Sequence, residues 1–159
     1  MFRVGFGQDS HRFTDDEKKM LVLGGVEIPG EAGLLGNSDA DVVIHALCRA
    51  LEQALGRESF SIYADKMHEQ VVDSSREYLK MAKSHVRESG YKIGNIGISI
   101  EAKKPKIIPI AEDIKKCLAG ILDIDHGSVG ISATSGEELT SFGRGEGIQA
   151  FAIVSLIKE

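Results

Sequence analysis

The chain has 159 residues, of which 42% are hydrophobic and 27% are charged, with a formal net charge of -5. This composition is typical of a single soluble domain, here residues 1–159, that is long enough to bury a sizeable core. The acidic balance argues against non-specific binding to nucleic acid or to an anionic membrane. No apolar run approaches the roughly 20 residues of a membrane span, and no signal peptide precedes the first strand-like segment, so we expect a cytoplasmic protein.

The hydrophobic pattern of the first half predicts two strands followed by two helices. Gly24-Gly25 interrupts the second strand and Pro29-Gly30 ends it, and the polar residues 37–39 could each cap the first helix. The segment 57–72 has no clean period and is expected to be a loop with short helical turns. The predicted elements are strands at 2–13 and 20–28 and helices at about 40–55 and 73–89.

The second half alternates strand and helix and supplies the rest of the sheet. Its predicted elements are strands at 91–102, 129–133 and 148–157, a helix from 109 to about 122, and a glycine-rich loop at 134–146. This order predicts an α+β fold, a two-layer sandwich of a mixed or mainly antiparallel sheet with helices on one face. The nearly unbroken apolar last strand suggests that its second face is also covered, by another subunit.

Two pairs of polar residues have the spacing of metal ligands. Asp9 and His11 lie two apart on a strand, and Asp41 and His45 lie four apart at a helix start, so each pair shares a face. Two histidines and one carboxylate would form a zinc site with one open position, as in catalytic zinc sites. The alternative is that each is an ordinary polar residue. The other histidines lack this spacing and are expected on the surface or in loops: His68, His85 and His126.

Two turns have the composition of phosphate-binding sites. Lys103-Lys104-Pro105-Lys106 lies between a strand and a helix N-terminus, where free N–H groups and lysines suit a phosphate; the alternative is a solvated basic turn. In Thr134-Ser135-Gly136-Glu137, hydroxyl and N–H groups precede a carboxylate that could hold magnesium; the alternative is a capping box of Ser135 with Glu138. An open zinc site, a second cation site and phosphate-binding turns together indicate phosphoryl chemistry by Lewis-acid activation.

The same residues carry a resemblance to the 2-C-methyl-D-erythritol 2,4-cyclodiphosphate synthase family of the non-mevalonate isoprenoid pathway. The resemblance covers Gly5 to Ile157 and rests on five motifs in the right order. They are Gly-x-Asp-x-His at 7–11, Ser-Asp-x-Asp-x-x-x-His at 38–45, Ala-x-x-Pro-Lys at 102–106, Ala-Thr-Ser-x-Glu at 133–137 and Gly-Arg-Gly-Glu-Gly at 143–147.

The resemblance implies a lyase that closes a cyclic diphosphate and releases CMP from 4-diphosphocytidyl-2-C-methyl-D-erythritol 2-phosphate. It implies a homotrimer around a sheet-lined axis, with active sites between subunits. It implies zinc, or another divalent transition metal, on Asp9, His11 and His45, and magnesium or manganese on Glu137. Asn37 and Ser135 are the implied catalytic residues. The implied substrate contacts are Asp9, Ser10, His11, Asn37, Ser38, Ala102, Pro105, Lys106, Ile107, Ile108, Thr134, Ser135, Gly136, Glu137, Ser141 and Arg144.

Three departures from the family pattern stand out. Asn37 occupies the place of a histidine, and Asn can donate a hydrogen bond but carries no charge. Ser135 replaces a threonine and keeps the hydroxyl. The family segments that hold the methylerythritol moiety have no match between Gly56 and Asp73, so no residue is assigned there. Two other hypotheses remain at this stage: a zinc-dependent nucleotide phosphohydrolase and a non-catalytic trimeric paralogue.

Overall fold

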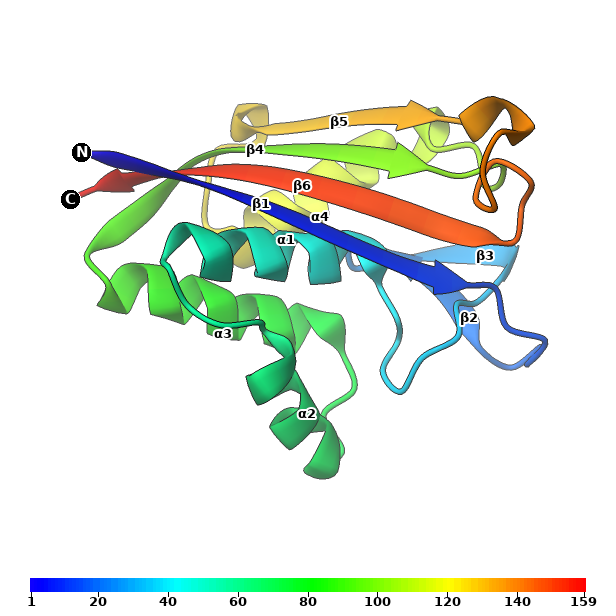
Figure 1. Ribbon diagram of the computed structural model, residues 1–159, viewed down its shortest axis with the longest axis horizontal. Helices are drawn as coiled ribbons and strands as arrows, with labels where there is room; N and C mark the ends of the chain where they lie inside the picture. Colours follow the sequence, from blue (N-terminus) through cyan, green and yellow to red (C-terminus); the bar gives the residue numbers. More distant parts are fainter.

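The computed structural model describes residues 1–159 as a four-stranded mixed sheet with the helices on one side (Figure 1). The strand order is β1-β6-β4-β5, in which β6 is antiparallel to both neighbours and β4 is parallel to β5. The strands are β1 (Phe2–Arg12), β4 (Tyr91–Glu101), β5 (Val129–Thr134) and β6 (Gly147–Lys158). The predicted α+β class with a mixed sheet is confirmed.

The helices form the second layer, and α2 projects beyond it (Figure 1). Ile96, Ile98 and Ile100 of β4 lie on the buried face, as the alternation predicted. The helices are α1 (Val42–Ala54), α2 (Ser61–Glu69), α3 (Ser75–Glu88) and α4 (Ala111–Leu122), with short 3-10 turns η1 (Ile108–Ile110), η2 (His126–Ser128) and η3 (Gly136–Glu138). None of these helices is long and apolar enough to cross a membrane.

Strand β1 and helix α1 pack unusually closely, and this contact positions the metal-ligand candidates. A Cβ on Gly7 would lie 2.0 Å from the Ala46 carbonyl oxygen, and one on Gly5 would lie 1.9 Å from that of Ala50. Because alternate strand residues share a face, Asp9 and His11 follow these glycines toward α1. The glycines therefore let the strand approach the helix that carries His45.

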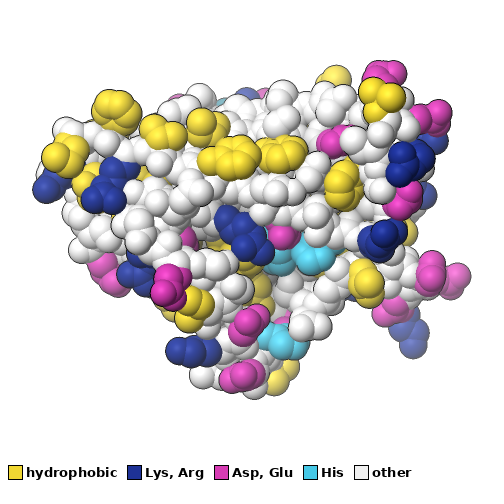
Figure 2. Space-filling view, viewed as in Figure 1, with side chains coloured by type: hydrophobic (Ala, Val, Ile, Leu, Met, Phe, Trp, Pro, Cys, Tyr) yellow, Lys and Arg dark blue, Asp and Glu magenta, His cyan; other side chains and the backbone are white.

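The opposite face of the sheet is apolar and exposed. Its outward side chains include Val4, Phe6 and Ile153, each about half exposed, and the ring of Phe6 stacks on that of Phe151. Figure 2 shows a row of hydrophobic side chains above a hollow where histidines gather. A shallow depression of about 550 Å³ on this face is lined mainly by β4, β5 and β6.

Three local predictions differ from the structure: the bounds of the second strand, the character of residues 57–72 and the cap of the first helix. Residues 20–28 form two strands, β2 (Met20–Leu23) and β3 (Val26–Ala32), joined by Gly24-Gly25, whose positive φ angles suit a tight hairpin turn. β3 continues through Pro29-Gly30 because it pairs with β2 alone, and an edge strand tolerates the missing N–H. The segment 57–72, predicted as a loop with short helical turns, contains the nine-residue helix α2, at which the rings of Phe60, Tyr63 and Tyr78 pack together.

The cap of α1 is the third error. Its N-cap is Asp41 rather than any residue at 37–39. The fully buried Asp41 carboxylate accepts the N–H groups of Val43 and Ile44 in the helix, and those of Gly24 and Gly25 in the hairpin turn. Burial and the nearby Asp39 carboxylate raise the pKa of Asp41 to about 6, against the opposing effect of the backbone N–H groups. Asp41 therefore joins the hairpin to α1.

Candidate active site

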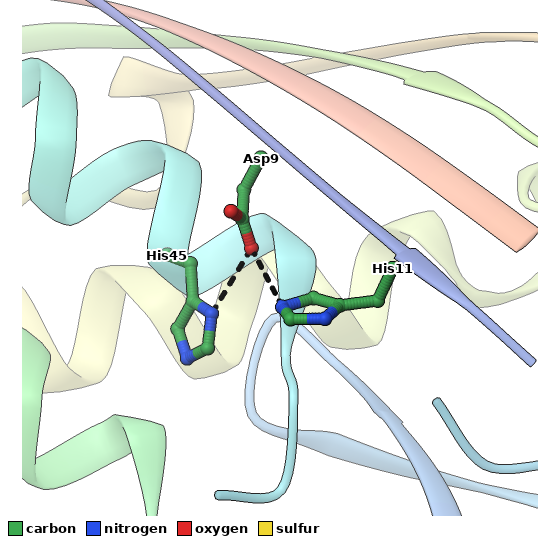
Figure 3. Close-up of side chains that lie close together, drawn as sticks. All are labelled: Asp9, His11 and His45. Atoms are coloured by element: carbon green, nitrogen blue, oxygen red, sulfur yellow. Dashed lines mark hydrogen bonds and ion pairs between the residues drawn. The ribbon is translucent and has the colours of Figure 1, made fainter. Parts of the chain in front are cut away.

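Asp9, His11 and His45 converge on one point between β1 and α1 (Figure 3). One carboxylate oxygen, Asp9 Oδ2, lies 3.0 Å from His11 Nε2 and 3.0 Å from His45 Nδ1. The potential ligand atoms of the three residues all lie within 4.8 Å of one another. One oxygen and two imidazole nitrogens form a donor set that suits zinc and related divalent metals. The predicted triad is thus assembled, and its residues fit a metal.

The charge state of Asp9 also suits a ligand. Burial alone would raise the pKa of Asp9, but its hydrogen bonds and charge interactions with His11 and His45 prevail and hold the pKa well below its usual range. Asp9 is therefore ionised at neutral pH. Its other oxygen lies 3.5 Å from the Arg49 guanidinium, which lies over the Phe60 ring.

Asp41 does not take part in this cluster. Although it lies four residues before His45, its position at the N-cap directs its carboxylate to backbone N–H groups of α1 and of the hairpin turn. The expectation that Asp41 and His45 share a face is wrong because residue 41 precedes the first helical residue. Only His45 of that pair reaches the metal cluster.

A cavity of about 190 Å³ adjoins the triad. Asn37 and Ser38, which the resemblance implies as substrate contacts, both line it. The rest of its wall comes from residues that the sequence did not assign: Arg49, Phe60, Ser61, Ala64, Asp65, His68 and Tyr78. Arg49 could have been found from its spacing, since it lies one helical turn after His45. The residues of α2 had no such signal.

Of the three remaining histidines, predicted as surface or loop residues, His68 and His126 are partly exposed as predicted and His85 is not. His68 of α2 lines the cavity beside the triad and is hydrogen-bonded to the Asp73 carboxylate. His85 of α3 is largely buried and its Nδ1 lies 2.7 Å from the buried Glu52 carboxylate of α1. His126 in η2 is partly exposed and pairs with Glu112.

A second cavity, of about 340 Å³, forms where the parallel strands β4 and β5 end. Strands that run in parallel bring their carboxyl ends to the same edge, and here the Ala102 N–H donates to the Thr134 carbonyl oxygen at 3.0 Å. The two turns predicted to bind phosphate therefore lie side by side. The lining residues are Ala102, Pro105, Lys106, Ile107, Ile108, Pro109, Ala133, Thr134 and Ser135.

Of the three lysines in the first turn, Lys106 lines this cavity. Lys103 pairs with Glu138 at 2.8 Å, and Lys104 lies 5.3 Å from the centre of the Phe13 ring. The alternative of a solvated basic turn therefore applies to Lys103 and Lys104, because their ammonium groups interact with Glu138 and with the Phe13 ring. The apolar wall with one ammonium group and two hydroxyls nearby is suited to a base and a phosphate.

The turn after β5 has a strained backbone. Glu137 and Glu138 have φ angles of +49° and +60°, which are uncommon for residues with a side chain. The Ser135 hydroxyl accepts the Glu137 N–H at 3.3 Å, so the alternative reading of Ser135 as a cap is right. The capping box is not complete, because Glu138 pairs with Lys103. Strain of this kind is common at functional turns, and the Ser135 hydroxyl also lies 3.3 Å from the exposed Glu137 carboxylate, to which it donates.

The remaining assigned residues lie outside the two cavities. Ser10 is exposed and alternates with Asp9 and His11, so its side chain lies on the other face of β1. The Ser141 hydroxyl accepts a hydrogen bond from Arg144 at 3.1 Å, and Arg144 pairs with Glu146 at 3.2 Å. Gly136 packs against Gly143 and supports the turn before Glu137.

The two cavities lie at opposite edges of the sheet. Asp9 and His11 of the candidate metal triad lie on β1, at one end of the order β1-β6-β4-β5. The second cavity lies at β5, at the other end, together with β4. They share no lining residue.

Comparison with known proteins identifies the family. The YgbB family model matches residues 2–157. The 2-C-methyl-D-erythritol 2,4-cyclodiphosphate synthase of Clostridium acetobutylicum is 46% identical over 156 residues, which cover 98% of this chain and 99% of that protein. The synthase of Nostoc punctiforme is 38% identical over 158 residues, covering 99% and 98%.

Solved structures agree with this result. The IspF protein of Plasmodium falciparum in complex with CDP has a TM-score of 0.87 and 31% identity, covering 99% of this chain and 97% of that one. The bifunctional IspDF of Campylobacter jejuni has a TM-score of 0.90 and 32% identity, covering 100% of this chain and 43% of that one.

The chain belongs to the YgbB family. Its relatives are cyclodiphosphate synthases, and the activity predicted from the motifs, 2-C-methyl-D-erythritol 2,4-cyclodiphosphate synthesis, is confirmed. The chain is an enzyme, a lyase of non-mevalonate isoprenoid biosynthesis. The hydrolase and non-catalytic alternatives are not favoured.

Proposed function

We propose that the chain converts 4-diphosphocytidyl-2-C-methyl-D-erythritol 2-phosphate at a site built by two copies of the chain. The observation that carries this proposal is the separation of the two cavities across the sheet. A metal cavity at one edge and a nucleotide-sized cavity at the other would meet when the β1 edge of one copy faces the β5 edge of the next. Such a head-to-tail contact closes into a ring, and a trimer is the ring that the family resemblance implies.

The exposed apolar face supports this assembly. Val4, Phe6 and Ile153 are each about half exposed, which is unfavourable for a contiguous group of large side chains on an isolated chain. In a trimer these outward faces of β1 and β6 would turn toward the common axis and be buried. Arg144 and Glu146 would lie toward the same axis.

The nucleotide would occupy the cavity at the ends of β4 and β5. Ala102, Pro105 and Ile107 would contact the cytosine and ribose through their apolar surface. The Lys106 ammonium group and the hydroxyls of Thr134 and Ser135 would donate to the phosphates. The P. falciparum relative was solved with CDP, a ligand of this chemical class.

The metal cavity would receive the methylerythritol phosphate. Asp9, His11 and His45 would hold zinc, and Glu137 would hold magnesium or manganese together with the substrate phosphates, as Mg²⁺ usually binds one or two carboxylates. Bound divalent ions neutralise the charge that develops on a transferring phosphoryl group. Asn37 would donate a hydrogen bond to the phosphate. Arg49, which keeps its buried Nε–H without a partner, would add positive charge.

The reaction is an intramolecular transfer. An oxygen of the 2-phosphate forms a bond to the β-phosphorus, the bond from that phosphorus to the CMP oxygen breaks, and CMP leaves with the electron pair. The chain's own contribution is to hold both phosphates in line at the junction of two cavities, which reduces the entropic barrier of ring closure. Ser135, at the strained turn, would donate a hydrogen bond to the transferring group.

Two measurements test the proposal. Purified protein with Zn²⁺, Mg²⁺ and the substrate should release CMP and the cyclic diphosphate, followed by phosphorus NMR; hydrolysis products alone would refute it. His45→Ala and Lys106→Ala variants should each be inactive, yet co-refolded mixtures should recover about a quarter of wild-type activity, because random assortment pairs the two intact half-sites. No recovery in a mixed trimer would place both halves of a site in one copy.

A further inference from the structure

The imidazole of His45 has a polar partner at each nitrogen. Nδ1 lies 3.0 Å from Asp9 Oδ2, on the side of the metal cluster, and Nε2 lies 2.9 Å from the Ser75 hydroxyl at the start of α3. His45 and Ser75 are buried, and Ser75 is fully inaccessible. Ser38 also approaches Nε2, but at 3.5 Å, so Ser75 is the closer partner. The ring orientation is thus set from two sides.

The hydrogen atoms of this chain of contacts can be counted. The Ser75 hydroxyl donates to Asp39 Oδ1, and Asp39 Oδ2 accepts the Ser75 backbone N–H at 2.9 Å. A hydroxyl has a single hydrogen, and an ionised carboxylate can only accept. With its hydrogen directed to Asp39, the Ser75 oxygen can only accept from His45. Nε2 of His45 therefore carries a hydrogen.

This assignment determines what Nδ1 can do. A neutral imidazole with its hydrogen on Nε2 has a lone pair on Nδ1. That lone pair points to the place where Asp9 and His11 also present ligand atoms. Nδ1 hydrogen-bonds Asp9 Oδ2 only when it carries a hydrogen of its own, and without that hydrogen its lone pair is free to bind a metal held between the two residues.

We propose that Ser75 and Asp39 are positioning residues, which hold His45 in the tautomer and ring orientation that bind the metal. The inference rests on the proposed metal-binding role of the triad. Outer hydrogen-bond partners of this kind orient metal-ligating histidines in general, and their loss typically weakens metal binding about 10- to 100-fold. Here the relay is the pair of hydrogen bonds that joins His45 of α1 to Ser75 of α3 and Ser75 to Asp39. The packing of α3 against α1 therefore determines which nitrogen of His45 carries the hydrogen.

The structural role of the same residues can be separated from this one. The Ser75 N–H donates to Asp39 at the N-terminal end of α3, where helical N–H groups lack helical partners. A Ser75→Ala variant keeps that backbone bond and loses only the hydroxyl. Ser84→Ala is the matched control, since Ser84 lies on the same helix and its hydroxyl donates to the Met81 carbonyl oxygen, away from the site.

The experiment measures Zn²⁺ affinity by chelator competition, together with thermal unfolding in chelator. We expect Ser75→Ala to bind Zn²⁺ about 10- to 100-fold more weakly and Ser84→Ala to bind as wild type. Wild-type affinity in a folded Ser75→Ala variant would overturn the inference and leave the metal site intact. Absence of Zn²⁺ binding by wild type would instead overturn the metal site itself.

A second measurement covers the case in which Ser75→Ala does not fold. Long-range proton–nitrogen NMR of zinc-loaded wild type reports which ring nitrogen of His45 carries the hydrogen. A hydrogen on Nε2 supports the relay. A hydrogen on Nδ1 would overturn it, because Nδ1 could then not bind the metal.

Discussion

Substitution of Gly7 by alanine tests whether the distance between β1 and α1 sets the metal site. A methyl group at this position would lie 2.0 Å from the Ala46 carbonyl oxygen and 2.6 Å from the Ala50 nitrogen. Both are backbone atoms of α1, so no side-chain rotation relieves the contact. Because Asp9 follows on β1 and His45 precedes Ala46 on α1, any separation of the two elements separates the metal ligands.

The magnitude follows from the geometry. A carbon–oxygen contact needs about 3.3 Å, so β1 and α1 would have to separate by about 1.3 Å. Metal–ligand distances tolerate only about 0.2 Å. We therefore expect Gly7→Ala to weaken Zn²⁺ binding at least about tenfold, the lower bound for a disturbed ligand environment. Overpacking should lower the free energy of unfolding by about 1–3 kcal/mol.

The assay is chelator competition for Zn²⁺, with urea unfolding in chelator to measure the stability of the fold alone. Gly130→Ala provides the control, because a Cβ there would have its nearest neighbour at 3.8 Å, an ordinary contact. That variant should unfold within about 0.5 kcal/mol of wild type and bind Zn²⁺ unchanged. If Gly7→Ala behaved like Gly130→Ala, the close contact of β1 and α1 would not determine the site.

Three further predictions concern the histidines and Asp9. His45→Ala should reduce bound zinc from one ion per chain to near none by atomic absorption while circular dichroism stays native; a variant that retains its zinc contradicts the triad. His68→Ala should lower kcat/KM by about 10- to 150-fold, since we expect His68 to hydrogen-bond a charged group of the substrate and such a bond contributes about 1.5–3 kcal/mol. His126→Ala is the matched control, because the His126 side chain is 43% exposed against 42% for His68 and is also paired with a carboxylate. It should change kcat/KM less than about twofold, and equal losses in the two variants would exclude a role for the cavity wall. Because the folded pKa of Asp9 is depressed, its stabilising contribution is present above about pH 4, the unfolded value, and is lost at lower pH. In chelator, wild type should therefore lose more urea resistance than Asp9→Asn between about pH 5 and 3, and parallel curves would contradict the shift.

Much of the site could be predicted from local sequence because its parts follow strand and helix periods. Asp9 and His11 share a face by their spacing of two, and the structure places both beside His45. The lysine and Thr-Ser turns were predicted as separate motifs, and they form one cavity because β4 and β5 run in parallel. The alternation of isoleucines in β4 also matched the buried face.

Other features depend on contacts between distant segments, which no local pattern records. Asp41 resembles a ligand by its spacing, yet N–H groups of the distant Gly24-Gly25 turn, together with those of α1, determine its role. Helix α2 has a weak apolar face. Phe60 at its N-terminus anchors it, because the Phe60 ring packs on those of His45 and Tyr78. Tertiary packing, not local preference, therefore made this segment helical.

The sequence by itself determined the candidate metal-binding triad, the two turns predicted to bind phosphate, and the family. Only the tertiary structure decided which of those residues meet. The strand order places the candidate metal triad and the cavity at the ends of β4 and β5 at opposite edges of the sheet, and the contact of α3 with α1 brings Ser75 to His45. The physical reason is that spacing along the chain fixes which face a side chain occupies, whereas sheet order and helix packing fix what lies opposite that face.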